Sequence, residues 1–249
     1  MASPPPAPWR ALATVGLAVV AGVIAPPCWV AAAHPLALLL VVAAIPHGAL
    51  DDHLLGQALG VSDRKGRGLC WATYLGAVVL MLGLAWLVPS FIFAVFLVIS
   101  AYHFGQSELP PSSSVVECLA RGGTYVLLLY SHAPPVKLPT WFVVLEPSHA
   151  SVAAAGCVIF HLWAWRRRVS DPTETAAAWS SLLRFFSVAS LLVLVDPLVG
   201  FAVYFCLWHA TDHVLLVDRD HRRSYTRRAL LAKAAPNALA SVGAVVAIS

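Results

Sequence analysis

The sequence predicts an all-α protein, a polytopic transmembrane helical bundle with about eight or nine spans. Hydrophobic residues make up 59% of the 249 residues and charged residues only 11%, with a mean hydropathy of +0.78. A soluble domain carries about 25% charged residues, so this composition excludes an ordinary soluble fold. The 16 lysines and arginines fall in short clusters between apolar runs. That pattern is typical of cytoplasmic loops and argues against nucleic acid as a partner.

We expect a Pro-rich, disordered cytoplasmic leader at residues 1–10 and a single transmembrane helical domain at 11–249. The first apolar run has no obvious small-residue cleavage site, so it is expected to be a retained helix and not a signal peptide. Pro26 and Pro27 interrupt it, which allows either one kinked span or a shorter span and a turn. The apolar runs are 11–33, 35–56, 69–88, 89–107, 116–132, 149–165, 176–195, 198–217 and 229–248.

Runs of about 20 residues suit a hydrocarbon core of about 30 Å, because a helix rises about 1.5 Å per residue. Runs 69–88 and 89–107 are joined by almost no sequence, which predicts an antiparallel hairpin. With the amino terminus inside, fifteen of the 16 lysines and arginines fall on or near the cytoplasmic side, and Lys137 falls outside. We therefore expect a multi-pass protein of the cell membrane with its amino terminus and basic loops in the cytoplasm.

Three runs begin at a proline on the outer side, and each carries a histidine 12 to 14 residues later. These histidines are expected about 18–21 Å below the outer end, at one common depth. The pairs are Pro35 and His47, Pro89 and His103, and Pro197 and His209. His213 follows His209 by four residues, a spacing that places both imidazoles on one face of a helix.

Four imidazoles at one depth can close around one divalent metal ion, because ionisable residues in spans usually face the bundle interior. The expected ligands are His47, His103, His209 and His213. Each second ring nitrogen needs a hydrogen-bond partner, and the nearby carboxylates are those of Asp51, Asp52, Glu108 and Asp212. For any single histidine, an interhelical hydrogen bond is the alternative explanation.

Two further histidines were considered for the site. His161 lies five residues before the basic cluster that begins at Arg166, so we expect it at the membrane interface. His53 follows His47 by six residues and would lie nearly opposite on an ideal helix. Pro46 makes ideal geometry doubtful there, so His53 is kept as a further candidate ligand.

Three motifs, taken in order, resemble those of the Brp/Blh family of membrane-embedded β-carotene 15,15′-dioxygenases. They are PHGALDDH at 46–53, YHFGQSE at 102–108 and WHATDH at 208–213. The resemblance implies a ferrous enzyme that splits the central double bond of β-carotene with O2 and yields two molecules of retinal. By motif, the iron-binding histidines of the family map onto the same four histidines that depth selects. The doubled acid at Asp51 and Asp52 departs from the single Asp of the family pattern, so the carboxylate that supports His47 stays open.

Aromatic side chains beside the histidines are candidates for binding a long, flat, apolar substrate. They are Tyr102, Phe104, Tyr204 and Trp208. β-Carotene is expected to enter sideways from the lipid bilayer through a tunnel with Ala101 and Gly105 on its wall, because moving it through water would expose its apolar surface.

Ligand type alone does not identify the metal, since imidazole suits iron, zinc and copper. The alternatives are a membrane metal or haem carrier and another membrane iron oxygenase acting on lipids. A di-iron desaturase uses several paired histidine boxes, whereas this chain has one HxxxH. The outer halves of the histidine-bearing runs are almost free of polar residues, which favours a closed site over a transport path.

Overall fold

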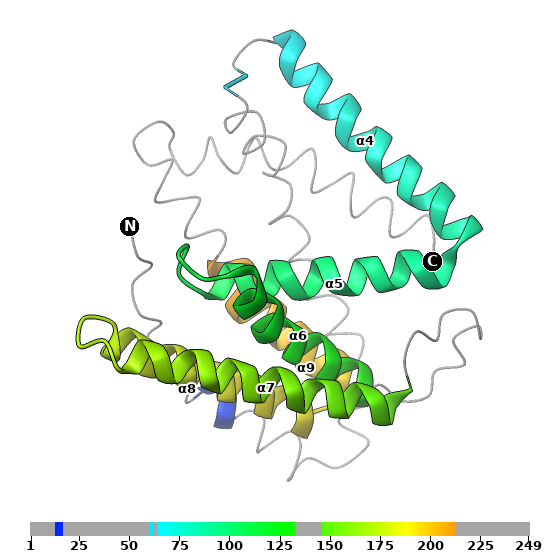
Figure 1. Cartoon of the computed structure of the whole chain (residues 1–249). Coiled ribbons are helices and arrows are strands. Elements are labelled where there is room, and N and C mark those ends of the chain that lie inside the picture. The colour runs from blue at the N-terminus through cyan, green and yellow to red at the C-terminus, as the bar shows by residue number, and fades with distance from the viewer. Residues whose placement is uncertain (1–12, 17–59, 62–63, 133–145, 213–249) are drawn as a thin grey trace.

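The computed structural model describes residues 13–16, 60–61, 64–132 and 146–212, and all regular secondary structure in these ranges is helical (Figure 1). The all-α prediction is therefore confirmed for this part of the chain. The expected leader and the runs 11–33, 35–56 and 229–248 lie wholly or mainly outside it. The helices are α4 (Arg64–Leu87), α5 (Pro89–Glu108), α6 (Val115–His132), α7 (Pro147–Val169), α8 (Thr175–Leu194), α9 (Pro197–Tyr204) and the π-helical η4 (Phe205–Ala210).

Prolines occupy the first position of three of these helices, where a missing N–H leaves no hydrogen bond unmade. They are Pro89 in α5, Pro147 in α7 and Pro197 in α9. Asp196 caps α9, because its side chain accepts hydrogen bonds from the backbone N–H groups of Leu198 and Val199. The helix starts predicted at Pro89 and Pro197 are thus confirmed.

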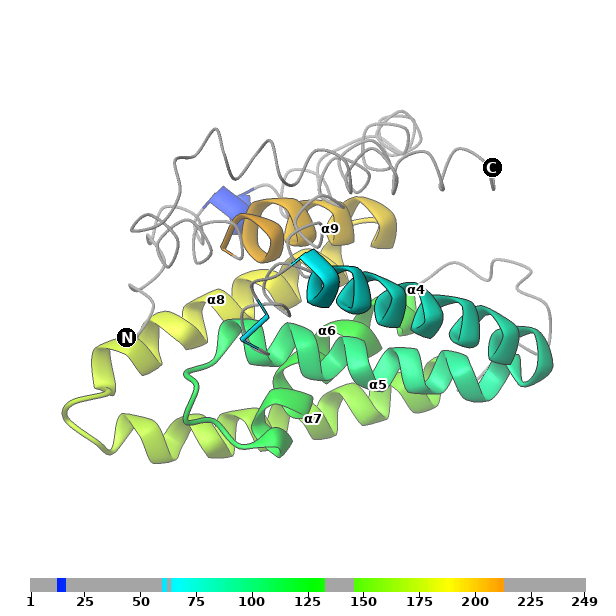
Figure 2. The ribbon, with the colours of Figure 1, turned by 90° about the horizontal axis from the view of Figure 1, so that it is seen from above.

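The predicted hairpin is present at the junction of α4 and α5. Only Val88 separates the two helices, and the chain folds back on itself there (Figures 1 and 2). The N–H of Val88 donates to the carbonyl of Leu84 at 2.7 Å, and its own carbonyl accepts from Ile92 at 3.1 Å. The reversal therefore leaves the hydrogen bonds of Val88 satisfied.

Three described helices are long and apolar enough to cross a bilayer, which indicates a membrane protein. They are Gly68–Leu87, Pro89–Glu108 and Thr175–Leu194. Helices α6 and α7 fall on the predicted runs but are more polar, with Glu117 and Arg121 in α6 and a basic cluster ending α7. The expected total of eight or nine spans is not confirmed.

Helix α6 packs against both α5 and α7, and its contact with α5 is a close approach of two backbones. A Cβ atom on Gly105 would overlap the backbone carbonyl of Cys118, and one on Gly122 would overlap that of Ala101. Small residues allow such contacts, which drive helix association in membranes. The expectation that Ala101 and Gly105 line a substrate tunnel is therefore wrong, since both lie in the α5–α6 interface.

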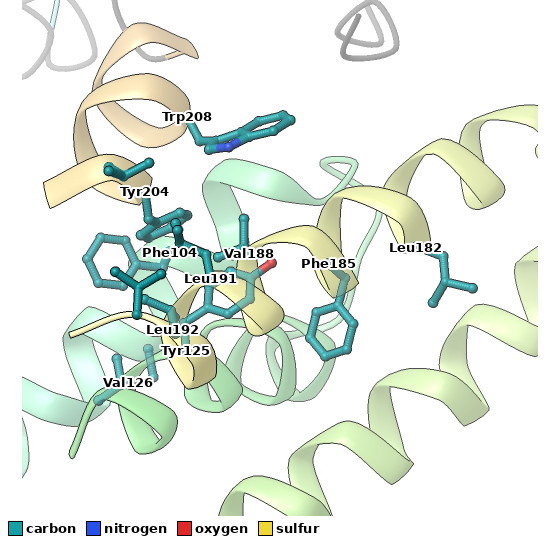
Figure 3. Close-up of a cluster of buried hydrophobic side chains, with 13 residues drawn as sticks. Phe104, Tyr125, Val126, Leu182, Phe185, Val188, Leu191, Leu192, Tyr204 and Trp208 are labelled. Carbon is teal, nitrogen blue, oxygen red and sulfur yellow. The ribbon is translucent and has the colours of Figure 1, made fainter. Parts of the chain in front are cut away.

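A hydrophobic cluster from α5, α6, α8, α9 and η4 holds the end of α5 against η4 (Figure 3). Seven of its side chains are fully buried, namely Tyr125, Phe185, Val188, Leu191, Leu192, Tyr204 and Trp208. The indole N–H of Trp208 donates to the Oγ1 of Thr14 at 2.9 Å, which joins the turn at 13–16 to η4. This packing fixes the helices that carry the two histidines described next.

Candidate metal centre

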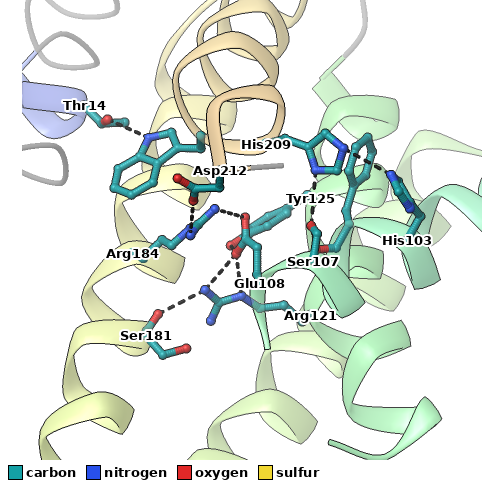
Figure 4. Close-up of polar contacts among 12 residues, drawn as sticks. Thr14, His103, Ser107, Glu108, Arg121, Tyr125, Ser181, Arg184, His209 and Asp212 are labelled. Atoms are coloured by element: carbon teal, nitrogen blue, oxygen red, sulfur yellow. Dashed lines mark hydrogen bonds and ion pairs between the residues drawn. The ribbon is translucent and has the colours of Figure 1, made fainter. Parts of the chain in front are cut away.

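The imidazoles of His103 and His209 face each other between the last turns of α5 and η4 (Figure 4). Their Nε2 atoms are 3.1 Å apart, and the ring planes are inclined at 71°. The two rings are therefore adjacent, as similar distances from Pro89 and Pro197 predict, while their depth in a membrane stays a prediction. His47, His53 and His213 lie outside the described residues, as do Asp51 and Asp52, so their parts in the site stay predictions.

His209 lies in η4, and this π-helical turn changes one premise of the sequence prediction. The spacing of His209 and His213 was interpreted on an uninterrupted α-helix, whereas residues Phe205–Ala210 form a π-helix. The hydroxyl of Thr211 donates to the carbonyl of Cys206 at 2.6 Å within the same widened turn. The turn that carries His209 is therefore π-helical, a form that occurs frequently at functional sites, and the shared face of His209 and His213 stays a prediction.

Ser107 fixes the orientation and the tautomer of His209. Its hydroxyl donates to the carbonyl of Phe104 at 2.9 Å and lies 3.2 Å from Nδ1 of His209. Since the hydroxyl proton is used by Phe104, Nδ1 of His209 donates to Ser107, and Nε2 keeps its lone pair. That lone pair faces His103. A metal-bound histidine needs this arrangement of a supported second nitrogen.

Aromatic rings enclose His209 on several sides. The ring of Phe104 lies edge-on to the imidazole with centroids 4.9 Å apart, and the ring of Phe205 stacks on it at 5.5 Å. Of the four expected substrate-binding residues, Phe104, Tyr204 and Trp208 are in the packed core and 9% or less exposed, while Tyr102 is half-buried. Phe104 and Tyr204 therefore lie against His209, whereas Trp208 lies against Arg184.

The two described carboxylates expected to support histidines both bind arginines. Oε2 of Glu108 accepts from Nε and Nη2 of Arg121 at 3.0 and 2.9 Å and from the hydroxyl of Tyr125 at 2.9 Å. Oε1 of Glu108 lies 3.3 Å from Nη2 of Arg184, whose Nη1 binds Asp212 at 2.7 Å. Two acids and two arginines thus form one network whose charges balance, in which the side chain of Asp212 is 27% exposed, and Ser107 contacts Nδ1 of His209.

His161, which was expected at the membrane interface, is buried inside the bundle. Its side chain is 4% exposed, and its Nε2 accepts a hydrogen bond from Nη1 of Arg121 at 2.9 Å. Arg121 also donates to the backbone carbonyl of Ser181 at 3.1 Å, and its guanidinium lies over the ring of Phe185. His161 is therefore part of the buried network on the α7 side.

Sequence reasoning missed Ser107, Tyr125 and the two arginines. Arg121 and Arg184 were counted among basic residues on or near the cytoplasmic side, yet they lie within α6 and α8 and are 0% and 7% exposed. A signal was present, because an arginine inside an apolar run is costly unless it has a buried partner. Ser107 belongs to the YHFGQSE motif and follows His103 by four residues, which places it on the same helix face.

The His103–His209 separation fits two ligands of one metal ion. Imidazole nitrogens bound at about 2.0–2.1 Å and at tetrahedral or octahedral angles lie about 2.8–3.4 Å apart. The observed 3.1 Å falls in this interval. A hydrogen bond between the rings has a similar length, so the distance permits a metal ion without requiring one. Within the ranges described, no group of three or more His, Cys, Asp or Glu is arranged as a metal site.

The fold and this site define a class, a helical membrane protein with paired imidazoles in an apolar bundle. The chain belongs to the beta-carotene 15,15'-dioxygenase family, which matches residues 38–249. It is 27% identical over 206 residues to the beta-carotene 15,15'-dioxygenase of uncultured marine bacterium 66A03, covering 79% of this chain and 73% of that protein. It is 28% identical over 250 residues to the probable beta-carotene 15,15'-dioxygenase Blh of Halobacterium salinarum, covering 83% and 67%. No solved structure matches significantly.

Proposed function

We propose that this protein is an Fe(II)-dependent dioxygenase that cleaves β-carotene with O2 at the central 15,15′ double bond and releases two molecules of retinal. The observation that carries the proposal is the pair of Nε2 atoms facing each other at 3.1 Å. Membership of the family and the names of the two relatives support the carotenoid substrate.

Four histidines would hold the iron, namely His47, His103, His209 and His213. The bound iron would supply the redox chemistry with O2 that protein side chains lack. One carbon–carbon double bond and the O–O bond break, and two carbonyl groups form, so the balance requires no external reductant. The ligands are neutral and leave the ion its full positive charge.

Residues around His209 orient its imidazole and keep water away from it. Ser107 would favour the tautomer of His209 in which Nε2 is unprotonated, because its hydroxyl oxygen accepts a hydrogen bond from Nδ1–H. Phe104 and Phe205 hold the imidazole plane and exclude water from its faces. His209 is 1% exposed, whereas His103 and Ser107 are exposed. We therefore place the substrate on the side of α5 that carries His103 and Ser107.

The route of the substrate follows from its apolarity. Exposing β-carotene to water would cost about 25 cal/mol for each Å², so the proposed entry is sideways from the bilayer. The core rings behind His209 are packed against one another, which leaves the His103 side for the polyene. The centre of the polyene must then lie beside Nε2 of His103.

Expression in a β-carotene-producing host tests the proposal. Loss of carotenoid colour with accumulation of retinal is expected for the parent chain and for His149→Ala, which replaces an exposed histidine at the start of α7. His103→Ala should retain carotenoid and form no retinal. A metal or haem carrier would bind its cofactor and leave carotenoid unchanged, and an oxygenase acting on other lipids would also form no retinal. Either outcome would refute the proposal.

A further inference from the structure

Arg184 contacts both of the chain segments that carry the described histidines (Figure 4). Its Nη1 lies 2.7 Å from Oδ2 of Asp212, and its Nη2 lies 3.3 Å from Oε1 of Glu108. The guanidinium also lies over the ring of Trp208, 4.8 Å from its centroid. Glu108 is the last residue of α5, and Trp208 lies in η4. One side chain of α8 therefore joins two other helical segments.

The acids that Arg184 binds are close in sequence to the histidines. Glu108 follows His103 by five residues, and Asp212 follows His209 by three. In a helix these intervals are about one turn, so a shift at either acid moves the histidine on the same segment. We infer that Arg184 is a positioning residue that fixes α5 relative to the His209 segment and so sets the separation of the two Nε2 atoms. This inference rests on the proposed metal site.

Burial strengthens the contact of Arg184 with Glu108, whereas the side chain of Asp212 is 27% exposed. Arg184 is 7% exposed, and the side chain of Glu108 is 0% exposed. A guanidinium is planar and presents its N–H groups in a fixed fork, which allows it to hold two carboxylates in a defined relative position. An ammonium group keeps the charge but lacks the fork. Arg184→Lys therefore keeps the network neutral while removing the geometric constraint.

Arg121 provides a matched control within the same network. It is also buried and also binds Glu108, but its other hydrogen bonds go to Ser181 in α8 and His161 in α7. Arg121 thus anchors α5 to the rest of the bundle, whereas Arg184 connects α5 to the His209 segment. If the role of Arg184 were only to stabilise the fold, the two arginines would affect metal binding equally at equal loss of stability.

The test is titration of the purified, metal-free full-length protein in detergent with Co²⁺, whose visible absorption reports coordination geometry. Thermal unfolding of each metal-free variant is measured in parallel. We expect Arg184→Lys to raise the Kd for Co²⁺ at least about tenfold, the lower end of what supporting residues contribute, and to change the relative intensities of the absorption bands. Arg121→Lys should raise the Kd less than about threefold at comparable stability, with parent-like bands.

Each result separates the positioning role from the metal site itself. If the parent protein shows no saturable Co²⁺ absorption, both the proposed metal site and the positioning role of Arg184 are refuted. If the parent binds Co²⁺ and folded Arg184→Lys keeps its Kd and spectrum, only the positioning role fails. Equal weakening by Arg121→Lys would likewise reduce Arg184 to a structural role. If Arg184→Lys does not fold, Asp212→Asn removes one arm of the connection, and an unchanged Kd in that variant would overturn the inference.

Discussion

Ser107 and Glu108 are adjacent in the chain and belong to two polar clusters of opposite character. The cluster around Ser107 contains His103 and His209, whose Nε2 atoms face each other at 3.1 Å. The cluster around Glu108 consists of two acids and two arginines whose charges cancel. The first cluster brings two imidazole rings together, whereas the second pairs acids with arginines.

This difference shows how the bundle keeps full charges away from the coordinating nitrogens. A carboxylate on His209 would strengthen its basicity, but an unpaired charge in an apolar bundle is costly. A hydroxyl supports the imidazole without adding charge. The arginines bind Glu108 and Asp212, which follow the two histidines in the chain. The ion pairs and hydrogen bonds of this network connect α5, α6, α7 and α8.

The largest expected effect comes from removing a coordinating nitrogen in the uncharged cluster. His103→Ala should reduce retinal formation below about 1% of the parent rate, equivalent to at least about 2.7 kcal/mol of barrier. Because His103 is exposed, the variant should insert and unfold like the parent. Retinal formed per folded protein is the measurement, with iron per chain as the second readout. Parent-like activity in this variant would remove His103 from the site.

Substitutions in the charged cluster should lower the free energy of unfolding. Arg121→Met leaves Glu108 and Asp212 with one arginine, and breaking a buried pair typically costs about 3–5 kcal/mol. Adding Glu108→Gln removes the surplus charge and leaves Arg184 with Asp212. We expect the double variant to recover a large part of the lost stability.

Reversible unfolding in detergent measures this difference. A double variant less stable than Arg121→Met alone would contradict the view that the network is held by charge balance.

A smaller effect is expected from Ser107, which supports the coordinating ring without contacting the metal. Ser107→Ala should weaken metal binding about 10- to 100-fold, while Ser107→Thr, which keeps the hydroxyl, should stay close to the parent. Co²⁺ titration distinguishes the two variants. Equal affinities of the Ala and Thr variants would mean that the tautomer of His209 is set by another group.

The proximity of His103 and His209 could be predicted because Pro89 and Pro197 start their helices, and residue counts then give similar positions along the two helices. The pairing of Glu108 could not, because its neighbours come from α6 and α8, far away in sequence. Carboxylates near histidines were assigned to histidines on proximity in sequence alone. An arginine at position 184 within an apolar run already required an acid, and that requirement indicates the network.

The π-helical turn at Phe205–Ala210 had no sequence signal comparable to the prolines. Likewise, Gly105 was interpreted as free space beside the site, whereas it permits the contact between α5 and α6. Helix identity and depth depend on local sequence, but helix register and interfaces depend on packing partners. That division explains why the proximity of two histidines could be predicted while the arginine partners of Glu108 and Asp212 could not.

The smallest effect is expected at a second Arg–Glu pair, which lies at the end of α7. Arg168 binds Glu117 at 3.0 Å, and the side chains of both are 18% exposed, in contrast to the buried pair of Arg121 and Glu108. Water screens partly exposed pairs, so Arg168→Met should lower the free energy of unfolding by about 1 kcal/mol or less. The identical change, arginine to methionine, is thereby compared at a buried and a solvated pair of one protein. If Arg168→Met destabilised the protein as much as Arg121→Met, burial would not be what distinguishes the charged cluster beside the histidines.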